Sequence, residues 1–414
     1  MPFGLHKLAG LSPWSGGGLV AVDLGGQSLK VLQLTPGDTP QLIAAGCVQT
    51  PPELSNDPMR RLDFQFEQLP GLLKAAGVKA KRAVCAIPCA QMVCRHLQVQ
   101  PEGKQSIGEA ARFAVAMQLG CEPGALSMRE IAVPDTTVGA GKTEVIAFAT
   151  AASVIARLMQ GLRAAKLEPV GMQSEFEAVV NVFRPVNKRD TDADTTSLYL
   201  DIGSTMTKVC LGHGHRIVFA KAIALGGKFL DAVAAKQAGC SVTEARALRL
   251  SLNQLTRTAP SAAPTVEGGG MAVLAAAMRR EQSESAGGAV TMAAPATSID
   301  AVTALANHAE RTRNAVDLTE PLRALTDEIA LCVRYYETLF PQRKVHRTIF
   351  VGGESRHVAL CQHIARMLKT PAHAADPLAR IARAGNEPVV GVDMSQAQPG
   401  WAVPMGLLMA PTDL

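Results

Sequence analysis

Short apolar runs alternate with longer amphipathic segments along most of the chain, which is typical of an α/β protein. The runs Leu19–Val22 and Val31–Leu34 flank a short polar segment, and so do Leu198–Leu200 and Val209–Leu211. Each pair predicts a strand, a tight turn and a second strand. Because the two pairs lie about half a chain apart, we expect a duplicated architecture.

Apolar residues recur every three or four positions in several longer segments, the period of an amphipathic helix. This pattern predicts helices over Leu62–Ala76, Ile107–Leu119, Ser153–Ala165, Phe229–Gln237, Val242–Leu252, Leu318–Leu339, Ala359–Leu368 and Trp401–Met409. Pro70 lies inside the first of them, where its missing N–H is expected to kink or break the helix.

The pattern changes between residues 89 and 160. Strand-like segments over Met92–Val99, Ser127–Val133 and Glu144–Thr150 enclose one predicted helix and precede another. An order of strand, helix, strand, strand, helix is typical of a compact α+β unit. We therefore expect residues 89–160 to form a subdomain inserted into the first half.

These changes of pattern divide the chain into six parts. We expect a flexible N-terminal segment (1–18), a first principal subdomain (19–88 and 161–196), the inserted subdomain (89–160), a second principal subdomain (197–227 and 318–390), a smaller subdomain (228–317) and a C-terminal helix region (391–414). Within 228–317, residues 256–300 are rich in Ala, Gly, Ser, Thr and Pro. Such a composition favours a mobile insertion, with a possible helix over Val273–Arg280.

Composition narrows the classes of function. The chain has 414 residues and a net charge of +5, without the clustered basic residues of a nucleic-acid surface. No apolar run is long enough for a membrane span, and residues 1–18 lack the apolar core of a signal peptide. The nine cysteines lack metal-type spacing, so we expect reduced thiols. We therefore expect a cytoplasmic protein without a nucleic-acid partner.

The turns of the two predicted hairpins share one motif. The first is Asp23-Leu-Gly-Gly-Gln-Ser-Leu-Lys30 and the second is Asp201-Ile-Gly-Ser-Thr-Met-Thr-Lys208. Small residues let backbone amides approach an anion, and an aspartate at a strand end can hold a hydrated Mg²⁺. One copy is a common hairpin turn. Two copies in register favour a pair of hairpins that grip a nucleotide triphosphate.

A third motif follows the predicted strand Thr348–Val351. Gly352-Gly353-Glu354-Ser355 joins this strand to the helix at 359–368. Bare glycine backbone lets a flat adenosine lie close, and the helix N-terminus can face the nucleotide. With the two hairpins, this motif resembles the adenosine motif of the actin-like ATPase superfamily. The resemblance implies an α/β, actin-like (ribonuclease H-like, duplicated) two-lobed fold with an inserted α+β subdomain.

Within that superfamily the chain is most similar to the PilM family of type IV pilus assembly, in the FtsA-like branch, which implies a role in pilus assembly or in related type II secretion-like assembly. The similarity rests on the order and spacing of short motifs outside 250–317. These are the opening Leu19–Val31, Ala86-Ile87-Pro88, Arg95-His96-Leu97, Ala164–Val170 with Glu175, Gly226-Gly227, Glu328–Tyr336 and Asp376-Pro377-Leu378.

The resemblance implies that ATP and Mg²⁺ bind between the lobes, with Asp23 and Asp201 holding the metal through water. The implied nucleotide-binding residues are Asp23, Gly25, Gly26, Gln27, Ser28, Lys30, Asp201, Gly203, Ser204, Thr205, Thr207, Gly226, Gly227, Lys228, Gly352, Gly353, Glu354 and Ser355. No residue stands out as a general base, so the chain is at most a slow ATPase.

Four departures from the family weaken the case for hydrolysis more than the case for the fold. Gly26-Gln27 replaces two serines, Lys208 replaces an acidic residue, and Gln173 replaces another ahead of Glu175. Glu354 stands where a third glycine is usual, and we expect its carboxylate to crowd or repel a nucleotide.

The resemblance also implies a partner and a location. The family sits at the inner face of the cell membrane and binds the cytoplasmic tail of PilN, in a groove between the first domain and the insertion. We expect such peripheral association here, with groove residues near Arg95, Leu97 and Arg112 and with self-association left open. Three alternatives remain: a non-hydrolysing scaffold, an FtsA-like division protein, and a small-molecule kinase. The kinase is disfavoured because no aspartate base is evident between the hairpins.

Overall fold

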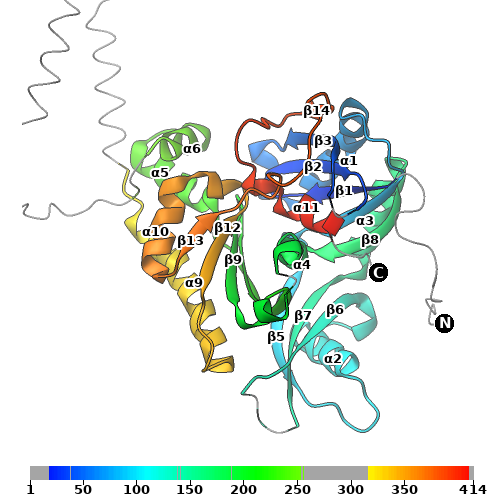
Figure 1. The fold of residues 1–414 in the computed structure, drawn as a ribbon, viewed down its shortest axis with the longest axis vertical. Coiled ribbons are helices and arrows are strands. Elements are labelled where there is room, and N and C mark those ends of the chain that lie inside the picture. The colour runs from blue at the N-terminus through cyan, green and yellow to red at the C-terminus, as the bar shows by residue number, and fades with distance from the viewer. Residues whose placement is uncertain are drawn as a thin grey trace, which may run out of the picture.

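Figure 1 shows the computed structural model of the chain. It describes residues 18–252, 255 and 316–409, except for 38, 138, 140 and 188. The expected flexible N-terminus, apart from Gly18, and the whole expected insertion 256–300 with its helix lie outside the described residues. None of the helices in the described ranges is long and apolar enough to cross a membrane.

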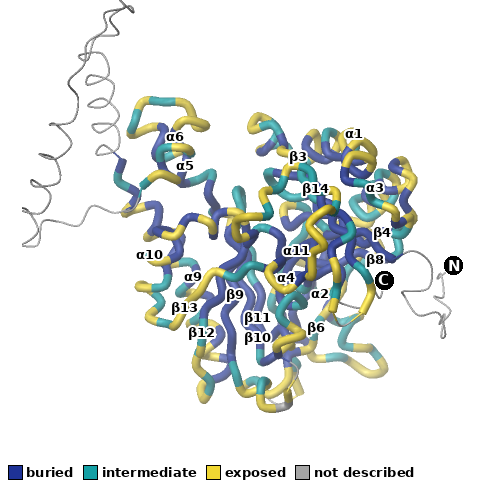
Figure 2. Tube along the Cα trace, turned by 45° about the horizontal axis from the view of Figure 1, so that its top comes forward, coloured by how far each residue is buried: buried dark blue, intermediate teal, exposed yellow. Residues whose placement is uncertain are grey.

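The first lobe is built on a six-stranded sheet of order β14-β3-β2-β1-β4-β8. Its strands are β1 (Leu19–Leu24), β2 (Ser28–Leu34), β3 (Leu42–Gln49), β4 (Arg82–Ile87), β8 (Glu168–Ser174) and β14 (Val389–Val390). β1, β2 and β3 pair antiparallel, whereas β4 and β8 continue the sheet in parallel. The strands are buried because helices cover the sheet, as the dark core in Figure 2 shows.

Helix α1 (Pro58–Ala75) covers one face of this sheet. The Asp57 carboxylate caps its start by accepting hydrogen bonds from the amides of Met59 and Arg60, at 3.1 and 3.0 Å. The helix continues through Pro70, so the expected break is absent. Pro70 is exposed while Leu69 and Leu72 beside it are buried, and this packing holds the helix together where its hydrogen bonding is weakest.

The second lobe holds a five-stranded sheet of order β11-β10-β9-β12-β13. The strands are β9 (Thr196–Ile202), β10 (Thr207–His213), β11 (Arg216–Ile223), β12 (Arg347–Val351) and β13 (Ala372–Ala374), and the helices of this lobe are α5 (Gly227–Ala238), α6 (Val242–Leu250), α9 (Thr319–Leu339) and α10 (Val358–Leu368). β9–β10 and β1–β2 are matching antiparallel hairpins, one in each lobe. This repeat is the predicted duplication.

The insertion is a three-stranded antiparallel sheet of order β5-β7-β6 with one helix. Its elements are β5 (Val93–Val99), α2 (Ile107–Leu119), β6 (Leu126–Val133) and β7 (Thr143–Ala151). The helix after β7, α3 (Ala152–Ala164), was expected to belong mainly to this unit. Instead Leu158 and Leu162 are buried in the core of the first lobe with Leu69. The insertion is therefore smaller than predicted.

Helices α4 (Glu175–Asn181) and α11 (Ala402–Met409) cross between the lobes, as Figure 1 shows. Gly406 lies so close to the carbonyl oxygen of Ala178 that any side chain there would overlap it. The chain returns to the first lobe earlier than expected: the Leu42 amide donates to Ala382 at 3.0 Å, and β14 pairs with β3. Residues 382–390, assigned from the sequence to the second lobe, thus lie against the first.

Candidate functional site

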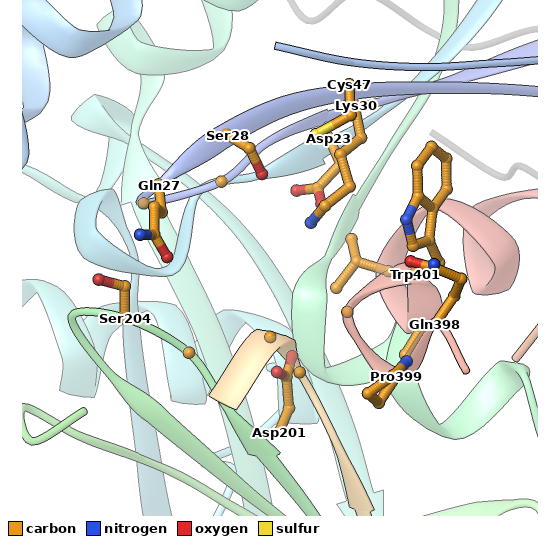
Figure 3. Close-up of a pocket in the computed structure, with 18 of the residues that line it drawn as sticks. Asp23, Gln27, Ser28, Lys30, Cys47, Asp201, Ser204, Gln398, Pro399 and Trp401 are labelled. Atoms are coloured by element: carbon orange, nitrogen blue, oxygen red, sulfur yellow. The ribbon is translucent and has the colours of Figure 1, made fainter. Parts of the chain in front are cut away.

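A cavity of about 350 Å³ lies between the two lobes (Figure 3). Both hairpins and the β12 turn supply its walls. The predicted site residues that line it are Asp23, Gly25, Gly26, Gln27, Ser28, Lys30, Asp201, Gly203, Ser204, Gly352 and Gly353. Gln27 and Ser204 approach each other from opposite lobes. Three sequence motifs that lie far apart along the chain therefore meet around one cavity.

The remaining predicted residues do not line this cavity; several of them brace the second hairpin. Thr207 Oγ1 donates to the carbonyl oxygen of Leu225 at 2.8 Å. The amides of Gly227 and Lys228 donate to the carbonyl oxygens of Gly203 and Ser204, at 3.0 and 2.8 Å. A side chain at Gly226 would collide with the backbone of that turn. Gly226 is needed for this close approach whether or not a ligand binds, whereas a side chain at Gly227 would meet the Glu354 carboxylate.

Two other predicted residues have local roles. Thr205 packs beside Gly26 of the first hairpin, so the two turns meet directly. Ser355 Oγ donates to the carbonyl oxygen of Val351, at the end of β12. Both contacts fix the shape of the cleft.

Each hairpin carries an aspartate opposite a lysine. Asp23 and Lys30 are cross-strand partners, and Lys30 Nζ lies 3.3 Å from Asp23 Oδ2. Asp201 and Lys208 are the matching partners, at 2.6 Å. Both aspartates are only 4% exposed. An ammonium therefore neutralises each aspartate.

Lys208 makes a second ion pair, with Glu175 at the start of α4. Glu175 also accepts a hydrogen bond from the Cys89 amide at 2.9 Å. Burial alone lowers the pKa of Lys208, but the attraction of Asp201 and Glu175 outweighs burial and holds this pKa well above its usual range. The lysine is therefore a fixed positive charge in the cleft.

The residues present do not fit a Mg²⁺ ion. The two carboxylates expected to hold it, Asp23 and Asp201, already pair with lysines. Within the part of the chain that the structure describes, no group of three Asp, Glu, His or Cys side chains is placed to hold a metal. Magnesium prefers oxygen ligands and waters around it, and here ammonium groups occupy that space.

The expectation that Glu354 crowds or repels a nucleotide is not met by this geometry. Its carboxylate is 1% exposed and does not line the cavity. Arg249 and Arg246 bind it at 2.7 and 2.8 Å, and Arg246 is itself part of the cavity wall. The same arginines bind Asp231, at 2.6 and 3.3 Å. The Glu354 charge is therefore compensated inside the second lobe.

Part of the cavity wall was not anticipated from the sequence. The segment before α11 supplies Gln398, Pro399 and Trp401, and β3 supplies Cys47 (Figure 3). Trp401 is 3% exposed, so it belongs to both the wall and the core. None of these residues belongs to a sequence motif. The return of the chain to the first lobe brings Gln398, Pro399 and Trp401 to the cleft, where Cys47 of β3 already lies.

A second cavity, of about 360 Å³, lies between the first lobe and the insertion. We call it the insertion groove. Its apolar lining comprises Ile87, Met92, Met128, Phe148, Ile155 and Met172. It runs between β6 and β8, which are the end strands of their sheets. Arg129 of β6 pairs with Glu177 of α4 at 2.8 Å beside it.

The residues expected to form the groove lie elsewhere. Leu97 is buried in the core of the insertion, and Arg112 donates to the carbonyl oxygen of Leu126 at 2.6 Å. Arg95 is on β5, the opposite edge of the same sheet from β6. The motif at 95–97 identifies the insertion, but it lies on β5 and not on β6, the edge strand that borders the insertion groove.

No protein-family model matches the sequence, and no curated protein matches it. Among solved structures, the chain is similar to a chain of the PilM–PilN type IV pilus biogenesis complex, with a TM-score of 0.64 and 17% identity over 94% of this chain and 97% of that one. The chain has the actin-like fold of PilM. This finding confirms the predicted fold.

Two other solved structures align with lower TM-scores. The ethanolamine utilization protein EutJ of Carboxydothermus hydrogenoformans aligns at a TM-score of 0.46 and 14% identity, over 96% of this chain and 91% of that one. MreB5 of Spiroplasma citri bound to AMPPNP aligns at a TM-score of 0.43 and 11% identity, over 94% of each chain.

The alignment with the PilM structure spans the insertion as well as both lobes, because it leaves out only a small part of either chain.

Proposed function

We propose that the chain is a type IV pilus assembly protein of the PilM kind, which holds a short tail of an inner-membrane partner. The observation that carries this proposal is the alignment with the PilM structure over almost the whole of both chains. The insertion groove supports it, since it is a channel between the first lobe and the insertion with an apolar stretch of wall beside Arg129, Glu130 and Glu177. The partner, rather than the chain itself, would then bring the protein to the inner face of the membrane.

The chemistry of the insertion groove suits an extended peptide. Met92, Met128 and Met172 line it, and methionine side chains adapt to varied apolar partners. The end strands β6 and β8 offer backbone groups for an added strand. We therefore expect a PilN-like tail to bind as an extended segment with apolar side chains.

We also propose that the interlobe cavity binds a nucleotide such as ATP with slow or absent hydrolysis. The small-residue turns and the Lys30 and Lys208 ammonium groups suit phosphates. The paired aspartates favour binding over catalysis, because neither is free to act as a base. The protein would then act as a nucleotide-sensing scaffold.

Fluorescence anisotropy with labelled tail peptides of PilN-like proteins tests the partner. Met128→Asp should weaken binding about tenfold or more, because it places a charge in an apolar channel. Met117→Asp is the matched control, since Met117 is 80% exposed on α2 and lies outside the groove. Thermal melts confirm that both variants fold.

Two results would count against the proposal. If no tail peptide binds the folded parent chain, the assignment to pilus assembly is wrong. If a peptide binds and Met128→Asp leaves its affinity unchanged, the site is not the insertion groove.

A further inference from the structure

Lys208 connects the two lobes at the floor of the interlobe cavity. Its ammonium lies 2.6 Å from Asp201 Oδ2 on β9 and is paired with Glu175, which begins α4 after the last strand of the first sheet. The lysine side chain is 9% exposed. The Lys208 ammonium thus links Asp201 of the second lobe to Glu175, which directly follows the last strand of the first lobe.

The ion pairs around Lys208 leave one carboxylate in excess. One ammonium faces two carboxylates, and the neighbouring Lys30 and Asp23 neutralise each other. A buried lysine is costly unless it is paired, and removing its charge would leave two buried carboxylates without their shared cation. A divalent cation entering here would meet two ammonium groups, and the aspartates of both hairpins are already paired with them. Asp393, which also lines the cavity, accepts hydrogen bonds from Ser395.

We propose that Lys208 takes the place of a divalent cation, so that the cleft accepts a nucleoside di- or triphosphate free of Mg²⁺. The ammonium shields the phosphates from Asp201 and Glu175, and the backbone amides of the hairpins bind the phosphate oxygens. This inference rests on the proposed nucleotide binding and specifies the ligand for that same cavity. It also accounts for the poor fit of this cavity to Mg²⁺.

The test compares nucleotide binding with and without magnesium, by calorimetry and with a fluorescent ATP analogue. The parent chain should bind ATP in EDTA as tightly as in MgCl₂, within about threefold. Lys208→Gln, which removes the charge and keeps a polar side chain, should bind ATP about tenfold or more tightly in MgCl₂ than in EDTA.

A second readout uses the metal alone. Mn²⁺ detected by electron paramagnetic resonance should remain free with the parent chain and become bound with Lys208→Gln, whose carboxylates are released. Lys30→Gln is the comparison variant, since it removes a cation from the other hairpin and frees only Asp23. It should bind Mn²⁺ more weakly than Lys208→Gln.

The outcomes separate the two proposals. Binding of ATP to the parent chain only in MgCl₂, or binding of Mn²⁺ by the parent chain, would overturn the role of Lys208 while leaving nucleotide binding intact. Failure of ATP to bind under either condition would overturn nucleotide binding itself, and with it this inference. If Lys208→Gln does not fold, ATP binding by the parent chain in EDTA and in MgCl₂, together with its Mn²⁺ binding, still tests the role of Lys208.

Discussion

The imidazole of His96 in the insertion lies against Ala220 in the second lobe, with 3.2 Å between His96 Nε2 and the Ala220 backbone nitrogen. Because the amide can only donate, Nε2 is the acceptor and the ring proton is on Nδ1. That nitrogen lies 2.9 Å from Glu144 Oε1, which also accepts from the Tyr335 hydroxyl at 3.1 Å. The ring stacks on Phe219 with centroids 4.7 Å apart. One side chain thus ties the insertion to the second lobe.

The first prediction concerns this tie. His96→Ala should destabilise the protein by about 2 kcal/mol, since it leaves the fully buried Glu144 with a lost hydrogen bond. It should also increase hydrogen exchange at the Ala220 amide. Arg95→Ala is the control, because Arg95 is exposed on the same strand. Unchanged protection of Ala220 in the folded variant would mean that the tie does not form in solution.

The second prediction concerns the buried ion network of the second lobe. Arg249→Met should lower the free energy of unfolding by about 3–5 kcal/mol, because it strands the Asp231 and Glu354 carboxylates away from water. Arg246→Met should cost less, since the Arg246 side chain is 26% exposed against 0% for Arg249. Urea denaturation measures both. Equal losses in the two variants would contradict the assigned burial.

The third prediction compares two glycines within helices. Gly406→Ala should lower the melting temperature strongly, because its Cβ would overlap the Ala178 carbonyl. Gly71→Ala is the counterpart: nothing lies within 4 Å of a Cβ at that position in α1. It should stabilise the chain by about 0.5–1 kcal/mol through helix propensity. A stable Gly406→Ala variant would show that α4 and α11 do not cross as described.

The fourth prediction concerns His213, whose ring contacts Tyr336 and Phe340. Burial, with Arg343 nearby and Asp135 opposing, lowers the pKa of His213 from 6.5 to about 4. Between these values the unfolded chain binds more protons than the folded chain, so stability falls as the pH drops from 6.5 towards 4. The ring is partly exposed, so we expect a loss of only about 1–2 kcal/mol.

His213→Gln removes this dependence and can keep a hydrogen bond to the Tyr336 hydroxyl, which lies 2.8 Å from His213 Nε2. Urea midpoints should be measured at one pH above and one pH below this window. The two midpoints should differ for the parent chain and lie closer together for the variant. Identical pH profiles for the two proteins would refute the assignment.

Strong local signals made much of the fold predictable from the sequence. The helix predicted over Ile107–Leu119 has the same bounds in the structure, because Ser106 caps its start and Gly120 ends it in a left-handed conformation. The two hairpins were predicted equally well, since each strand is a buried apolar run beside a small-residue turn. In contrast, β14 has only two residues and no pattern of its own.

The site was predictable only in part, because pairing between distant side chains leaves no local pattern. The sequence identified Lys208 as a departure from the family, but not the two carboxylates that hold it. It identified Glu354 without the arginines of α6 that neutralise it. Both errors concern charge. Glu175 lies 33 residues from Lys208 and Arg246 lies 108 residues from Glu354, so the fold alone brings these groups together. Asp201 is close to Lys208 in the sequence, but only the antiparallel register of the hairpin makes the two partners.

The crossing of α4 and α11 limits how the two lobes can move. Since the Gly406 backbone is pressed against Ala178, the lobes cannot part there without stripping the two helices from each other. Elsewhere, Lys228 Nζ of the second lobe contacts Asn56 Oδ1 of the first at 2.9 Å, between exposed side chains. We therefore expect any opening of the cleft to pivot at the helix crossing and to break the exposed Lys228–Asn56 contact first.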